Sequence, residues 1–70
     1  MATGKIKDLF PEGNDGSQEG AGTVTETNGA DYVFFTPDDV AVGATPLSAG
    51  KNVTFDKNSD TGTNVQNAPN

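Results

Sequence analysis

The chain has 70 residues, which is enough for one small domain, so we expect a single domain over residues 1–70. It contains no cysteine and no histidine, which excludes a disulfide, the usual structural zinc site and catalytic triads built on these residues. Ten acidic side chains against four lysines give a net charge of −6, whereas nucleic-acid-binding domains usually carry a basic patch. We interpret this acidity as a contribution to solubility, in preference to an acidic face that binds a basic partner.

The sequence contains no apolar run of membrane-spanning length. Its first residues, 1–7, lack the apolar centre of a signal peptide. We therefore expect a cytoplasmic protein without a membrane contact.

Short stretches of β-forming residues alternate with turn signals along the chain. Polar residues and three glycines make 11–20 an extended, flexible loop, and Asn28-Gly29 is a hairpin signal. After the third strand, Pro37-Asp38-Asp39 suits a short helical turn, followed by a linker of small residues over 40–50. The predicted strands are 5–10, 21–26, 31–36, 51–57 and 63–68.

This order of strands, with no apolar stripe at helical spacing, predicts an all-β fold. The expected architecture is a small five-stranded antiparallel Greek-key barrel, because closure removes exposed strand edges. Alternation in the third strand places Phe35 in the core and leaves Phe34 either as an exposed ring or as a half-buried one. The predicted core residues are Ile6, Val24, Val33, Phe35, Val40, Val53, Phe55 and Val65.

Five short motifs follow one another in the order found in one family of small barrels. Gly4-Lys5-Ile6-Lys7 resembles an opening Gly-x-Val-Lys, and residues 19–25 (Glu-Gly-Ala-Gly-Thr-Val-Thr) resemble Lys-Gly-Phe-Gly-Phe-Ile. Residues 31–36 (Asp-Tyr-Val-Phe-Phe-Thr) resemble Val-Phe-Val/Phe-His. Residues 47–55 and 62–68 resemble Leu-x-x-Gly-x-x-Val-x-Phe and Gly-x-x-Ala-x-Asn-Val. Together these motifs resemble the cold-shock domain family, which has an OB-fold and binds single-stranded nucleic acid.

The resemblance implies a face on which aromatic rings stack bases, but this chain departs from the family there. Asp8 stands where the family has a tryptophan, and Glu19 stands in place of the lysine of the first motif. Ala21 and Thr23 replace that motif's two phenylalanines, and Thr36 replaces the histidine of the second. Since each stacked base contributes roughly 1–3 kcal/mol, these losses remove most of the stacking energy.

By this resemblance Phe34 is the stacking ring that remains, and two lysines keep positive charge near it. Phe10 could widen the aromatic patch, although packing at a strand end is the simpler reading of that ring. The candidate nucleic-acid-binding residues are Lys5, Lys7, Phe10, Thr23, Phe34 and Thr36.

We expect a monomer that binds single-stranded RNA or DNA weakly, with no cofactor. The alternatives are a protein-interaction module on the same barrel, whose acidic face mimics nucleic acid or regulates its binding, and an accessory domain that binds nothing. An enzyme is not expected, because Asp38 and Asp39 are adjacent and form no evident acid–base pair. Residues 56–62 alternate oxygen ligands but lack the closing glutamate of a calcium loop, so no metal site is predicted.

Overall fold

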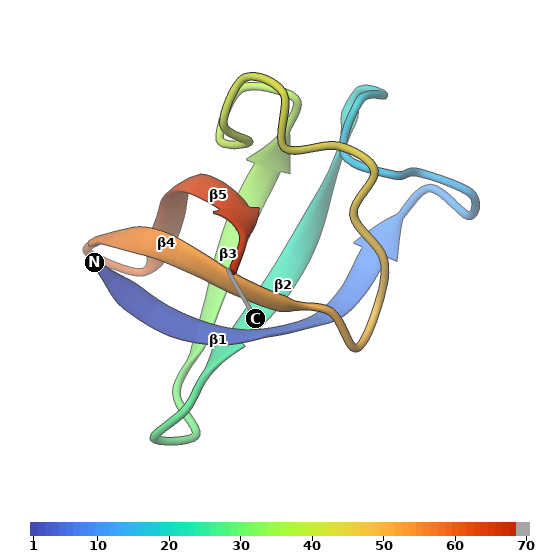
Figure 1. The fold of residues 1–70 in the computed structure, drawn as a ribbon. Coiled ribbons are helices and arrows are strands. Elements are labelled where there is room, and N and C mark those ends of the chain that lie inside the picture. The colour runs from blue at the N-terminus through green and yellow to red at the C-terminus, as the bar shows by residue number, and fades with distance from the viewer. Residues whose placement is uncertain (69–70) are drawn as a thin grey trace.

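The computed structural model describes residues 1–68, which form a closed five-stranded barrel (Figure 1). The all-β prediction is confirmed. The third strand has the predicted bounds, whereas the first begins at Ala2 rather than Lys5 and the last begins at Thr61 rather than Thr63. The strands are β1 (Ala2–Phe10), β2 (Gly20–Glu26), β3 (Asp31–Thr36), β4 (Asn52–Asn58) and β5 (Thr61–Asn67).

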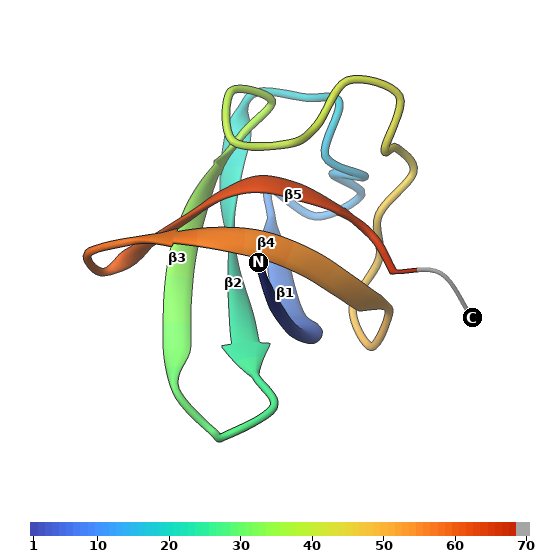
Figure 2. The same ribbon diagram turned by 60° about the vertical axis from the view of Figure 1, so that its left-hand side comes forward.

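The strands follow the order β1-β2-β3-β5-β4 around the barrel, which is consistent with a small OB-like barrel. Figure 2 shows β4 and β5 crossing over the sheet formed by β1, β2 and β3. One pairing corrects the prediction of an antiparallel barrel: β3 and β5 are parallel, through Val33 and Thr61. The other four pairings are antiparallel, and in a closed ring of five strands the fifth pairing must then be parallel. A second parallel bridge joins Val40 to Val65. Within residues 1–68 the structure has no helix of the length and apolarity needed to cross a membrane.

Apolar side chains from all five strands and from the β3–β4 connection fill the barrel. Five of the predicted core residues are confirmed as buried, and Val40 packs partly buried against them. Tyr32 also packs there, with its ring centroid 5.5 Å from that of Phe55. The buried cluster consists of Ala2, Ile6, Val24, Phe34, Leu47, Val53, Phe55 and Val65.

The two faces of β3 are the reverse of those predicted. Phe34 is completely buried, whereas Phe35 is 54% exposed and Val33 is 44% exposed. The predicted core positions Val33 and Phe35 are therefore wrong, and so is the solvent-facing position of Phe34. In a β-strand, a shift of one residue in register exchanges every side chain between the two faces.

The β2–β3 hairpin explains this shift. A two-residue turn at Asn28-Gly29 would place Val24 opposite Val33. Instead residues 27–29 form a three-residue loop: Glu26 N donates to Ala30 O at 2.7 Å, and Gly29 N donates to Glu26 O at 2.8 Å. Gly29 has a φ of 97°, the left-handed conformation that this loop type requires. Val24 consequently lies opposite Tyr32, and Tyr32 rather than Val33 faces inward.

The same register places Gly22 opposite Phe34. A Cβ atom at residue 22 would lie 2.7 Å from Cζ of Phe34 and 2.8 Å from the carbonyl oxygen of Asp8. Both distances are shorter than real contacts allow. The missing side chain of Gly22 therefore provides the space that the ring of Phe34 fills.

Gly22→Ala should accordingly destabilise the barrel by about 1–3 kcal/mol, because the added methyl group overpacks the core against Phe34. The measurement is urea unfolding of the variant and the parent. Ala21→Ser changes the next residue of β2, which faces the other way, and should alter stability by about 0.5 kcal/mol or less. Equal stability of Gly22→Ala and the parent would contradict this packing.

Candidate nucleic-acid interface

The outward side chains of β1, β2 and β3 form one continuous surface, here called the outer face. Strand pairing arranges them in three rows, each crossing the three strands. A register shift between Ile6 and Asp8 adds Lys7 to the β1 edge of this surface. The rows are Phe10–Ala21–Phe35, Asp8–Thr23–Val33 and Lys5–Thr25–Asp31.

The first row carries two exposed aromatic rings. Phe10 is 60% exposed and Phe35 is 54% exposed, and the small side chain of Ala21 lies between their positions on β2. A shallow, open hollow is lined by these three residues together with Pro11, Glu19 and Gly20. An exposed cluster of large apolar groups on a small domain is typical of a binding surface, because such groups gain by leaving water.

A buried asparagine holds the strand ends that carry these rings. Nδ2 of Asn14 donates to the carbonyl oxygen of Phe10 at 2.7 Å and to Oγ1 of Thr36 at 2.9 Å. Oδ1 of Asn14 accepts a hydrogen bond from Gly16 N at 2.8 Å. The side chain therefore links the end of β1 to the end of β3 and to the loop between β1 and β2.

The backbone of Phe35 is fixed separately. Its amide donates to Oδ2 of Asp39 at 2.8 Å, and its carbonyl accepts a hydrogen bond from Asp39 N at 2.8 Å. Asp39 in turn belongs to the segment that pairs with β5, since Val65 N donates to its carbonyl at 2.8 Å. The exposed ring thus stands on a backbone with few alternative conformations.

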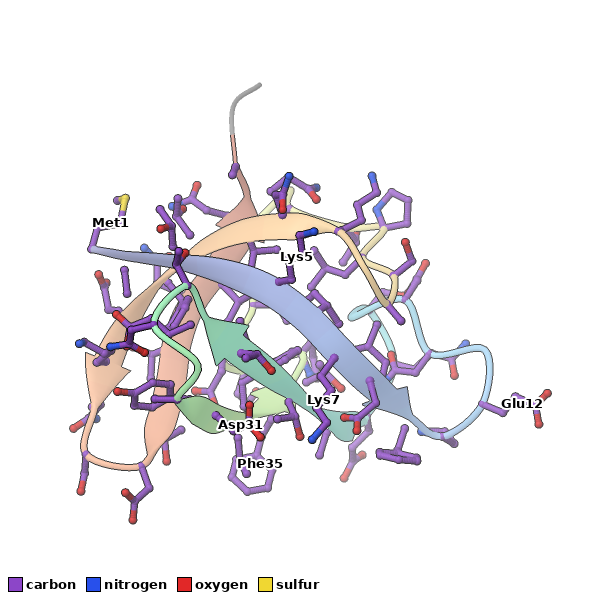
Figure 3. All side chains as sticks on the ribbon, turned by 90° about the horizontal axis from the view of Figure 1, so that it is seen from below. Met1, Lys5, Lys7, Glu12, Asp31 and Phe35 are labelled. Atoms are coloured by element: carbon purple, nitrogen blue, oxygen red, sulfur yellow. The ribbon has the colours of Figure 1, made fainter. Side chains whose placement is uncertain are left out.

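At the opposite edge of the outer face, Lys7 approaches Asp31, with 3.4 Å between Nζ and Oδ2 (Figure 3). Oγ1 of Thr25 donates to Oδ1 of Asp31 at 2.6 Å. The hydroxyl of Thr25, followed by the ammonium group of Lys7, lowers the pKa of Asp31 below its usual value. Both charges are exposed, so the pair adds little stability, and Lys7 remains able to exchange Asp31 for another anion.

The outer face also carries acidic groups without a basic partner. Within residues 1–68, Glu19 makes no side-chain hydrogen bond or ion pair, and Oδ1 of Asp8 is buried without a hydrogen-bond partner. Adding Lys5, Lys7 and Asp31 gives two positive and three negative charges on this surface and its rim. The net charge of this surface therefore does not favour a polyanion, so a polyanion that binds here needs other contacts in addition to those of the two lysines.

The structure brings three of the six predicted site residues onto the outer face near one another: Lys7, Phe10 and Thr23. Lys5 also faces outward, but it pairs with Asn52 and lies at the border with β4. Phe34 is wrong as a stacking ring, because its side chain fills the core above Gly22. Thr36 is wrong as a ligand contact, because it is buried and its hydroxyl accepts from Asn14.

Sequence reasoning missed Phe35 and Val33 as surface residues. The signal for them lay in β2, where Gly22 and Val24 share the inward face and leave room for a large ring opposite the glycine.

Comparisons of the chain with protein-family models, with curated proteins and with solved structures found no match.

The loop after β1 packs more closely than its composition indicates. Asn14 and Gly16 are buried, and Leu47 N donates to the carbonyl oxygen of Asp15 at 2.7 Å. Residues 12–13 and 17–19 are exposed. Flexibility of residues 11–20 remains a prediction, which we restrict to these exposed parts.

Asn14→Ala should lower the free energy of unfolding by about 1–3 kcal/mol, because it leaves buried polar groups without partners. Asn14→Asp keeps the acceptor for Gly16 N but loses both donated bonds, so it should destabilise as well. Asn58→Ala, an exposed position at the end of β4, is the matched control and should change little. Chemical unfolding that ranks Asn14→Ala with Asn58→Ala would show that Asn14 does not hold these strand ends.

Proposed function

We propose that this protein is a non-enzymatic, cytoplasmic, monomeric module that binds single-stranded RNA or DNA weakly through the outer face. The observation that carries the proposal is the row Phe10–Ala21–Phe35, in which two rings more than half exposed flank a small residue. Flat, exposed rings on a rigid sheet stack bases without demanding one sequence. The motif order that resembles cold-shock domains supports the same ligand class.

The residues of the outer face supply two kinds of contact, stacking on bases and charge contacts to phosphates. Phe35 and Phe10 supply stacking, at roughly 1–3 kcal/mol for each base. Lys7, and Lys5 at the border with β4, supply contacts to phosphates. This chain has two exposed rings where cold-shock domains have a larger aromatic platform, and acidic groups lie nearby. We therefore expect weak binding, with dissociation constants in the micromolar range or higher.

Salt should weaken this binding only moderately. For single strands the affinity falls with a log–log slope of about 0.7 for each neutralised phosphate. Two lysines allow two such contacts, so a fourfold increase in salt concentration should weaken binding about sevenfold. A much steeper dependence would point to a basic surface elsewhere.

The acidic groups favour a second candidate, a protein partner that inserts a basic side chain into the hollow. Glu19 lines the hollow beside two aromatic rings, and the chain carries a net charge of −6. An arginine would stack on a ring and pair with the carboxylate. This candidate uses the same surface, so one set of variants tests both.

The test is titration of a fluorescein-labelled, mixed-sequence single strand at low salt. Phe35→Ala should weaken binding about 5- to 150-fold, the equivalent of one lost stacking contact. Val42→Ala removes apolar surface from an exposed position in the β3–β4 connection, outside the outer face, and should bind like the parent. If Phe35→Ala also binds like the parent, the stacking surface is not the outer face. If the parent binds an arginine-rich peptide and no oligonucleotide, the second candidate holds.

A further inference from the structure

The hollow between the two rings contains an acidic residue, and its charge can affect which base binds there. Its lining consists of Phe10, Phe35, Pro11, Gly20, Ala21 and Glu19. Glu19 is the one charged residue in that set, and no lysine lines the hollow. A base that stacks in this hollow therefore meets a carboxylate as the one charged side chain of the lining.

We propose that Glu19 makes the outer face prefer bases with an exocyclic amino group over thymine and uracil. This inference rests on the proposed function, since it assigns a specificity to the same stacking site. An ionised carboxylate only accepts hydrogen bonds. Cytosine offers the N4 amino donor, whereas thymine and uracil place a carbonyl oxygen at the same position.

The carboxylate is available for such a contact. Within the part of the chain that the structure describes, Glu19 is exposed and has no hydrogen-bond or ion-pair partner. A hydrogen bond from an amino group to an ionised carboxylate is charge-assisted and therefore stronger than one between neutral groups. A carbonyl oxygen at the same place would instead face a negative charge.

Close packing of the β2 backbone against the end of β1 fixes the position of the backbone at Glu19. It immediately precedes Gly20, the first residue of β2. A Cβ atom at residue 20 would lie 2.0 Å from the carbonyl oxygen of Phe10 and 2.7 Å from Nδ2 of Asn14. The backbone of β2 therefore approaches the end of β1 as closely as a glycine permits, which holds the backbone next to Glu19 against the end of β1. Glu19 and Phe10 both line the hollow.

The test compares labelled oligodeoxycytidine and oligothymidine of equal length at low salt. Both are flexible pyrimidine strands, and their bases differ in the groups at ring positions 3 and 4 and in the 5-methyl group of thymine. The parent should bind oligodeoxycytidine about fivefold or more tightly, as a single discriminating contact allows. Glu19→Gln should reduce this ratio to about one, because an amide both donates and accepts hydrogen bonds.

The matched control is Glu12→Gln, which removes the same charge from the same loop. Figure 3 shows Glu12 at the tip of the loop, away from Phe35. Glu12→Gln should keep the preference for oligodeoxycytidine. This comparison separates a contact at the hollow from a general effect of net charge.

Three results would overturn the inference, and they are distinguishable. Equal affinity of the parent for the two strands would overturn the base preference and leave the proposed function standing. A preference that survives in Glu19→Gln would remove Glu19 as its cause. Absence of binding to either strand would overturn the proposed function and the preference together.

Discussion

The register between β2 and β3 determines the rest of this structure. Gly22 lies opposite Phe34, and the ring of Phe34 occupies the space that a side chain at residue 22 would need. The three-residue loop closed by Gly29 sets the same register from the end of the hairpin. Because side chains alternate along a strand, this single choice buries Phe34 and turns Phe35 and Val33 outward. The outer face exists as a consequence of how the core is packed.

Two sets of hydrogen bonds then hold the strand ends that carry the exposed rings. Asn14 links the carbonyl oxygen of Phe10 to the hydroxyl of Thr36, and Asp39 binds the backbone of Phe35. The two rings thus stand on a backbone that hydrogen bonds hold in place. Little backbone conformational entropy is therefore lost when a ligand binds. Lys7 is shared with Asp31, and Glu19 has no basic partner, so stacking rather than charge dominates the binding we propose.

Much of the fold could be predicted from the sequence, because turn residues and β-branched runs mark strands locally. The face of β3 could not, since Asp-Tyr-Val-Phe-Phe-Thr has aromatic residues on both faces and Asn28-Gly29 suits turns of either two or three residues. Lys7, Phe10 and Thr23 enter the predicted site through the resemblance to cold-shock domains. Alternation from Ile6 would turn Phe10 inward, and the register shift between Ile6 and Asp8, which the sequence does not announce, turns it outward. The Asn14 contacts join residues from β1, the loop and β3, and no local pattern reveals a hydrogen bond across 22 residues of sequence.

The most direct test of this account compares the stability of Phe34→Ala with that of Phe35→Ala by urea or thermal unfolding. Phe34→Ala should lose about 3–5 kcal/mol of stability or fail to fold, because it leaves the space opposite Gly22 empty. Phe35→Ala should change stability by about 1 kcal/mol or less, because more than half of this residue is exposed to solvent. The reverse order, with Phe35→Ala severely destabilised and Phe34→Ala close to the parent, would contradict the register and with it the outer face.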